Sequence, residues 1–363
     1  MVGLTTLVTT PDDLSRGEVS MKQPWNATAA VLATCVALAL AGCARGSGEE
    51  AADGTYTIKF SHVVTPQTPK GQAAEKFKEV VEEKTDGQIK VEIYPNSELY
   101  GDEDELQALQ SNAVQMLAPA GAKFSTIAPQ LQVLDLPFLF DTVDEIPEVF
   151  SPDTTIGKAI YENQDLADRK IKVLGLWDNG LKHVSSNRPM TNPKDLKGMR
   201  FRIQPSEVLK DMIEAWGGAA TPMSFSEVYT SLQTGVIDAQ ENTYSSMESQ
   251  KMHTVQKHIT ETVHGYVGYI LVINDEFFEG LPGELQDAVL EAADEASEFN
   301  RTIAEQYNEE SKQEIVEAGT TQITSLSDQQ RQTFKDAVVP EVWNKHAAVI
   351  GEDLIKELLA NTQ

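Results

Sequence analysis

The stretch from Glu284 to Ala318 contains neither proline nor glycine and is rich in glutamate, alanine and glutamine. Apolar side chains recur in it at helical spacing, namely Leu285, Val289, Ala292, Ala296, Ile303, Tyr307 and Ile315. A single helix over residues 282–318 would be roughly 54 Å long at about 1.5 Å per residue, which exceeds the width of one small lobe. The heptad pattern is too poor for a coiled coil. The stretch therefore predicts one helix that spans the hinge between two lobes.

Strands and helices alternate along the chain before this helix. Residues 57–62, 89–94, 171–177 and 266–273 have the composition of strands, and a helix is expected to end near residue 86. Such alternation is typical of α/β lobes with parallel sheets. About 310 residues follow residue 54, which is enough for two lobes.

The chain begins with a targeting segment. Met21 is a credible start, and the apolar run at residues 29–40 is too short to span a membrane comfortably. The sequence Leu-Ala-Gly-Cys at residues 40–43 is that of a bacterial lipoprotein cleavage site, in which the cysteine thiol receives the lipid. We expect residues 1–42 to be an upstream segment and a lipoprotein signal peptide. The alternative is a plain secretory signal with an incidental cysteine.

The positions of the two cysteines are consistent with export of the protein. Cys35 lies inside the signal and Cys43 is the expected lipidation site, so the mature domain has no thiol to pair and must rely on its core. Residues 43–54 are small, polar and acidic, and we expect them to form a flexible tether. The predicted location is the outer face of the cell membrane, in the periplasm or on the cell surface.

Charge and motifs exclude several classes of function. The formal net charge of −27 argues against nucleic acid and against an anionic membrane surface as partners. The chain has no Walker loop, nucleophile elbow, CxxC pair or HExxH motif. His253 and His258 are five residues apart, the wrong spacing for one helix face. We therefore expect no enzyme, no cofactor and no metal site.

One basic residue stands inside an apolar strand. Residues 199–203 are expected to form a short strand that contains Arg202, and residues 227–234 a helix capped by Ser226. A buried arginine is costly unless it meets an anion, and its planar guanidinium binds a carboxylate through two hydrogen bonds. We expect Arg200 to face the other side of the strand and to be exposed or packed on the surface.

These segments resemble the substrate-binding proteins of tripartite ATP-independent periplasmic (TRAP) transporters, in particular the DctP-type binders of C4-dicarboxylates. The resemblance covers roughly residues 56–319, with several motifs in one order and at similar spacing. The motifs are Phe60-Ser61-His62, Pro69-Lys70-Gly71, Tyr94-Pro95-Asn96-Ser97, Gln115-Met116-Leu117-Ala118-Pro119, Trp177-Asp178-Asn179-Gly180, Ser186-Asn187-Arg188-Pro189, Gly198–Ser206, Pro222–Tyr229, Leu232–Asn242 and His264-Gly265-Tyr266.

The resemblance implies a bilobal, periplasmic-binding-protein-like α/β fold with a ligand cleft between the lobes. We expect lobe I to comprise residues 55–179 and 268–307, and lobe II residues 180–267 and 308–363. The long helix would be shared between them.

The resemblance also implies where the ligand lies. Arg202 occupies the position of the family's carboxylate-clamping arginine, with a structural ion pair to a neighbouring acid as the alternative. Asn242 is placed on the same bound carboxylate. Lys182 would supply a second, separated cation, with a surface lysine as the alternative. Phe225 would form an apolar wall, with core packing as the alternative. The remaining candidates, each with a structural role as the alternative, are His62, Lys70, Trp177 and Tyr266.

The expected function is that of an extracytoplasmic binding protein. It would capture a small organic acid by closing two lobes and deliver it to a TRAP membrane permease. Ala120 and Gly121 stand where sialic-acid-binding relatives carry an acidic and a small residue, which favours a small diacid such as succinate, fumarate or malate. The alternatives are a monocarboxylate or sugar-acid ligand, and a sensory module that presents its ligand to a receptor.

Overall fold

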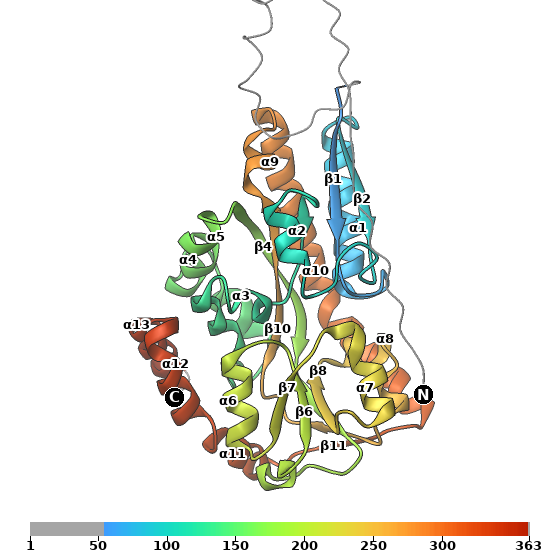
Figure 1. Ribbon diagram of the computed structural model, residues 1–363, viewed down its shortest axis with the longest axis vertical. Coiled ribbons are helices and arrows are strands. Elements are labelled where there is room, and N and C mark those ends of the chain that lie inside the picture. The colour runs from blue at the N-terminus through green and yellow to red at the C-terminus, as the bar shows by residue number, and fades with distance from the viewer. Residues whose placement is uncertain (1–53, 362–363) are drawn as a thin grey trace, which may run out of the picture. The chain divides into compact units, whose positions relative to one another are not determined.

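Two β-sheets organise the protein, for which a computed structural model describes residues 54–361. The five-stranded sheet has the order β2-β1-β3-β10-β4, and the six-stranded sheet the order β11-β9-β5-β8-β6-β7. The strands are β1 Tyr56–Ser61, β2 Ile89–Tyr94, β3 Met116–Leu117, β4 Ile171–Leu181, β5 His183–Ser186, β6 Arg200–Ile203, β7 Ala219–Pro222, β8 Ala239–Asn242, β9 His258–Glu261, β10 Tyr266–Asn274 and β11 Gln322–Ser325. We call the part around the five-stranded sheet lobe I and the part around the six-stranded sheet lobe II (Figure 1).

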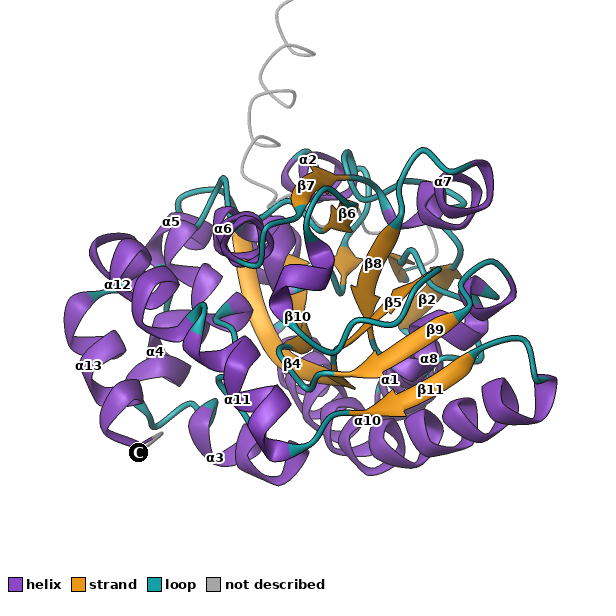
Figure 2. Ribbon diagram, turned by 90° about the horizontal axis from the view of Figure 1, so that it is seen from below, coloured by secondary structure: helices purple, strands orange, loops and turns teal. Residues whose placement is uncertain are grey.

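Helices flank the strands on both sides. Figure 2 shows α4, α12 and α13 on one side of them and α1, α8 and α10 on the other. The α-helices are α1 Pro69–Lys84, α2 Glu105–Gln110, α3 Ile146–Val149, α4 Thr155–Tyr161, α5 Gln164–Ala167, α6 Glu207–Ala215, α7 Val228–Thr234, α8 Tyr244–Ser249, α9 Asp275–Glu279, α10 Gly283–Ala318, α11 Asp328–Asp336, α12 Val339–Ile350 and α13 Glu352–Asn361. The 3₁₀ turns are η1 Gly121–Phe124, η2 Pro129–Asp135, η3 Val143–Glu145, η4 Pro193–Leu196, η5 Phe225–Glu227 and η6 Met252–Thr254.

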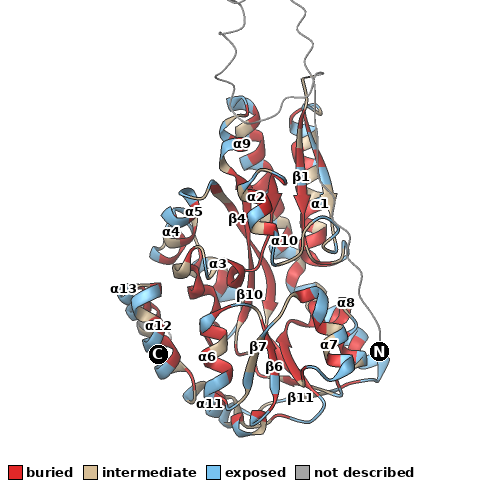
Figure 3. Ribbon diagram, in the orientation of Figure 1, coloured by how far each residue is buried: buried red, intermediate tan, exposed pale blue. Residues whose placement is uncertain are grey.

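Both sheets are mixed, so the prediction of parallel sheets is wrong in part. In lobe I, β1 pairs with β2 and β3 in parallel, but β10 runs antiparallel to β3 and β4. In lobe II, β6 is parallel to β7 and β8, whereas β5 is antiparallel to β8 and β9. The antiparallel pair β4 and β10 runs from lobe I towards lobe II (Figure 1), and every residue of β10 is buried (Figure 3).

The long helix predicted from the sequence is present as α10, which covers Gly283–Ala318. Its first half presents Leu285, Val289 and Ala296 to the hydrophobic core of lobe I, with Phe60 and Phe77. Near its other end, Ile315 packs in a separate cluster of lobe II. One helix therefore contributes to the cores of both lobes, as a hinge-spanning helix must.

Polar side chains of α10 hold it against the hinge strand β4. Asn300 accepts a hydrogen bond from the backbone N–H of Asp178 at 2.5 Å, and Asn308 donates to the carbonyl of Asn179 at 2.7 Å. These contacts explain why β4 continues to Leu181, although the apolar pattern ends at Trp177.

Two further predictions concern the N-terminal cap of α7 and the start of the chain. Ser226 lies inside the turn η5 and does not cap α7, which begins at Val228. The first N–H of that turn, on Phe225, instead donates to the carboxylate of Asp102. The predicted signal peptide and most of the tether, with Cys43, lie outside the described residues, and the predicted lobe boundaries stay predictions.

Candidate ligand-binding site

A small cavity lies where segments of the two lobes meet, and the centre of a water-sized sphere can occupy about 20 Å³ of it. It is lined by Val63, Val64, Lys70, Asp102, Ala120, Gln204, Phe225, Asn242, Ser246, Val267 and Tyr269. Several of these residues follow the carboxyl ends of strands β1, β6 and β8 or end such a strand. Ligands of α/β sheets commonly bind outside the carboxyl ends of the strands, and this cavity is the candidate site.

Lys70 reaches the cavity from the first turn of α1. Thr68 caps this helix by accepting a hydrogen bond from Gly71 N, and Gly71 packs so closely that a Cβ there would lie 2.5 Å from the carbonyl oxygen of Pro66. The Lys70 ammonium donates to Ala118 O at 3.0 Å and lies 3.9 Å from the centre of the Tyr269 ring. Burial lowers the pKa of Lys70 to about 8, against the opposing effect of nearby carboxyl groups.

An ion pair that the sequence did not reveal borders the same cavity. The carboxylate of Asp102 lies 3.1 Å from the ammonium of Lys123, and both side chains are almost fully buried. Asp102 Oδ2 also accepts the N–H of Phe225 at 2.6 Å. Burial alone would raise the pKa of Asp102, but Lys123, the Phe225 N–H and Arg202 together lower it below its ordinary value. Asp102 is therefore an ionised carboxylate at the site.

Arg202 is buried with only 1 % of its surface exposed, on strand β6. Its Nε and Nη2 both donate to the carbonyl of Met223, at 3.1 and 2.9 Å. Within residues 54–361 no carboxylate oxygen lies within 4 Å of its guanidinium. Arg202 does not itself line the cavity, but Gln204 does, two residues further along the same face. Arg200 is also two residues from Arg202, so side-chain alternation places both on one face of β6, and the prediction that Arg200 faces the other side is wrong. It is exposed because it stands at the start of the strand, where it pairs with Asp238 at 2.9 Å.

Two other predicted residues line the cavity from lobe II. Asn242 ends strand β8, and its side-chain oxygen accepts the N–H of Thr243 at 3.0 Å, which fixes the orientation of the amide. Phe225 begins the turn η5 and contributes an apolar face. Their contact with a ligand stays a prediction, but both stand where that prediction requires.

Lys182 lies in a different environment from the one expected. Its ammonium is 2.8 Å from Oε2 of Glu241, and the same oxygen lies 3.2 Å from Nε2 of His264. All three side chains are buried, and none lines the cavity. Burial would raise the pKa of Glu241, but Lys182 and His264 lower it to about 2. The structure gives Lys182 a buried ion pair, and its predicted role as the second ligand cation finds no support in this geometry.

The remaining predicted residues are also buried but do not line the cavity. Trp177 belongs to the core of lobe I, where its indole N–H donates to Ser297 Oγ at 3.0 Å. The hydroxyl of Tyr266 donates to the carboxylate of Asp178. Burial, together with the charge of Lys70, lowers the pKa of His62 to about 3, so its imidazole is neutral. The hydrogen bonds of Trp177 and Tyr266 fit the structural roles that the sequence left open as alternatives.

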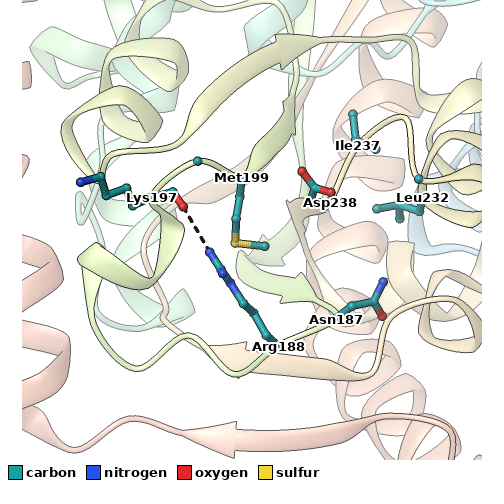
Figure 4. Close-up of a pocket in the computed structure, with 9 residues that line it drawn as sticks. Asn187, Arg188, Lys197, Met199, Leu232, Ile237 and Asp238 are labelled. Carbon is teal, nitrogen blue, oxygen red and sulfur yellow. Dashed lines mark hydrogen bonds between the residues drawn. The ribbon is translucent and has the colours of Figure 1, made fainter.

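A larger hollow exists on lobe II, away from the candidate site. It is lined by Asn187, Arg188, Lys197, Gly198, Met199, Leu232, Gly235, Ile237 and Asp238 (Figure 4). Arg188 donates to the carbonyl oxygens of Asp195 and Lys197, at 2.5 and 3.3 Å, and is itself exposed. Its charge is therefore solvated, unlike that of Arg202, and the hollow lacks a buried cation that would require an anion.

Neither a metal site nor a membrane span is found among residues 54–361. No group of three or more histidine, cysteine or carboxylate side chains is arranged to hold a metal ion there. No helix in that range combines the length and apolar character needed to cross a membrane.

Comparison with known proteins identifies the family. The model of DctP, bacterial extracellular solute-binding protein family 7, matches residues 60–348. The C4-dicarboxylate-binding periplasmic protein DctP of Rhodobacter capsulatus is 42 % identical over 306 residues, which cover 84 % of this chain and 90 % of that protein. A TRAP periplasmic solute-binding protein from Shewanella oneidensis, solved with bound succinate, has 41 % identity and a TM-score of 0.81, over 85 % of this chain and all of that one.

More distant members of the same group carry other acids. A TRAP solute-binding protein from Chromohalobacter salexigens, solved with bound D-glucuronate, has 29 % identity and a TM-score of 0.77, covering 84 % of this chain and all of that one. The two-lobe fold is common to these binding proteins, which are transport proteins and not enzymes. The chain belongs to the DctP family of bacterial extracellular solute-binding proteins, and it is a solute-binding protein of the TRAP type.

Proposed function

We propose that the protein binds a C4-dicarboxylate, such as succinate, fumarate or malate, and delivers it to the membrane subunits of a TRAP transporter. One observation carries the proposal: Arg202 is a fully buried cation with no carboxylate of the described chain within 4 Å. Asp102 and Glu241 act on its charge only from beyond contact distance, and a bound carboxylate would add the direct, bidentate contact that a buried guanidinium favours.

The charges around the cavity favour a dianion. Lys70, Lys123 and Arg202 are cations, and Asp102 is an ionised carboxylate. Burial raises the pKa of the neighbouring Glu105 to about 8, so this carboxyl group is mostly neutral at pH 7. Three cations and one carboxylate leave a surplus of two positive charges, which a dicarboxylate balances. Lys70 and Lys123 are the cations that we propose for the second carboxylate, in place of Lys182.

The apolar part of the lining favours a short diacid over a sugar acid. Val63, Val64 and Val267 line the cavity together with Phe225, and they suit methylene or methine groups between two carboxylates. A sugar acid would bring several hydroxyl groups that these side chains cannot hydrogen-bond. Gln204, Asn242 and Ser246 supply some polar partners, so a sugar acid such as glucuronate is the second candidate.

A ligand screen tests this proposal. Thermal unfolding is compared with and without succinate, fumarate, malate, butyrate and glucuronate. A ligand present at about a hundred times its Kd stabilises the folded protein by about 2.7 kcal/mol. We expect the three C4 diacids to raise Tm and butyrate to have little effect. A rise with glucuronate but not with any C4 diacid would establish the second candidate instead.

Membrane attachment forms a separate part of the proposal. The Leu-Ala-Gly-Cys sequence at residues 40–43 supports a lipid anchor on Cys43, on the outer face of the membrane. Cys43→Ser is expected to release soluble protein or to leave an unprocessed precursor. Partitioning of the variant into a detergent phase to the same extent as the wild type would contradict the anchor.

A further inference from the structure

Asp102 joins segments that are far apart in the sequence. It follows β2 of lobe I, and its carboxylate accepts the N–H of Phe225, on the turn after β7 of lobe II, at 2.6 Å. The same oxygen lies 3.1 Å from the ammonium of Lys123 on η1. The next residue, Glu103, accepts a hydrogen bond from the hydroxyl of Ser224 at 3.2 Å. The acidic loop before α2 therefore crosses from lobe I to the turn that precedes α7.

The turn that Asp102 contacts is also the turn that Arg202 holds. Arg202 donates twice to the carbonyl of Met223, and Asp102 accepts from the N–H of Phe225, two residues later. Arg202, the proposed carboxylate-binding residue, and Asp102 of lobe I therefore both bind the backbone of the stretch from Met223 to Phe225. Asp102 also lines the cavity itself, so its negative charge lies close to the place where a ligand carboxylate would bind.

We propose that Asp102 is a specificity-determining residue, which offsets one of three buried cations so that the site is matched to a dianion. This inference rests on the proposed function. Without the charge of Asp102, Lys70, Lys123 and Arg202 would leave a surplus of three positive charges. Its side chain contributes in two separable ways, because its oxygen accepts the Phe225 N–H and its charge opposes the cations.

Asp102→Asn separates the two contributions, since an amide oxygen still accepts the N–H of Phe225 but carries no charge. The readout is the ratio of the Kd of succinamate to that of succinate. The two probes have the same length and differ by one negative charge. One additional unit of positive charge in a buried site should raise this ratio roughly tenfold or more. Asp102→Ala should raise the ratio as well, but with weaker binding of both probes, because the bond between the lobes is lost.

The matched control keeps the charge. In Asp102→Glu the carboxylate is retained on a longer side chain, so the surplus remains two. Its ratio should lie within about threefold of the wild type. Isothermal titration calorimetry at one pH and ionic strength measures all four proteins, and circular dichroism verifies that each is folded.

The outcomes are distinct. A wild type that binds succinate and an Asp102→Asn variant with an unchanged ratio would overturn the role of Asp102 alone. A wild type that binds no C4 diacid would contradict the proposed function, and this inference with it. If Asp102→Asn fails to fold, Asp102→Ala supplies the test, because it removes the same charge. Its ratio should rise roughly tenfold, and an unchanged ratio would again overturn the inference.

Discussion

The ammonium of Lys182 lies 2.8 Å from a carboxylate oxygen of Glu241, at a place where each side chain is only 1 % exposed. A buried pair of this kind is costly to break, because removal of one partner leaves the other charge without compensation. His264, on the same oxygen, is the third member of the network.

Lys182→Met is therefore expected to destabilise the protein. Loss of the ammonium should lower the free energy of unfolding by about 3 to 5 kcal/mol, as measured by urea denaturation. The double variant Lys182→Met/Glu241→Gln, in which both charges are absent, should recover most of this loss. A decrease below about 1 kcal/mol in the single variant would show that Glu241 is compensated by other groups.

Arg202→Lys is expected to weaken succinate binding although it keeps the charge. The lysine has no planar fork and loses at least one charge-assisted hydrogen bond, so the affinity should fall roughly ten- to a hundredfold. Calorimetry measures the change, and Arg200→Lys at the exposed start of the same strand is the matched control. Equal affinities of wild type and Arg202→Lys, with equal Tm, would place the ligand carboxylate elsewhere.

Binding of a dianion should weaken as the pH rises from 7 to 9. Burial lowers the pKa of Lys70 to about 8 and raises that of Glu105 to about 8. Above this pH the site loses a positive charge or gains a negative one, and either change reduces the attraction. The Kd of succinate should rise roughly tenfold across this range. Glu105→Gln should reduce the slope, whereas a Kd that is constant or falls with pH would contradict the charge assignment.

Mild acid should destabilise the fold through buried histidines. Burial, as the largest cause, lowers the pKa values of His62 and His183 to about 3. The unfolded chain takes up these protons below about pH 6.5 and the folded protein only near pH 3, so stability is lost as the pH falls through that window. Together the two histidines should remove about 2 to 4 kcal/mol of unfolding free energy between pH 7 and pH 5, as measured in urea, whereas Glu105 and Asp135, whose raised pKa values are about 8 and about 6, act in the opposite direction.

Replacement of one histidine tests the cause. Relative to the wild type, His183→Gln should gain about 1 to 2 kcal/mol of unfolding free energy at pH 5 compared with pH 7, because one of the two histidines no longer titrates on unfolding. An identical pH dependence of the wild type and His183→Gln would exclude this histidine as a source.

Elements with a strong local pattern were predictable from the sequence. Helix α10 covers Gly283–Ala318 where residues 282–318 were expected, because no helix breaker interrupts its apolar spacing. The end of β4 was not predictable, since Asp178 and Asn179 are held in the strand by side chains of α10 more than a hundred residues later. Sheet direction depends on such long-range pairing as well.

The residues of the candidate site were likewise predictable where the local sequence was unusual, and were missed where only long-range contacts define them. Arg202 was identifiable because a guanidinium in an apolar strand is unusual by itself. Asp102 was missed because it stands in an acidic loop that resembles a solvated surface, and only the fold brings it to Lys123 and Phe225. Lys123 offered a weak signal, as a charge within a largely apolar stretch. The ion pair of Lys182 and Glu241 was also missed, because the two residues are far apart in the sequence and only the pairing of β5 with β8 brings them together.

The attachment of α10 to both lobes restricts how its length can vary during evolution. Insertion of one residue near its middle would rotate everything beyond it by roughly 100° and advance it by about 1.5 Å. Asn308 would then leave the carbonyl of Asn179, and Ile315 would turn out of its apolar cluster. Homologous helices should therefore accept substitutions readily, while insertions and deletions accumulate in the loops on either side.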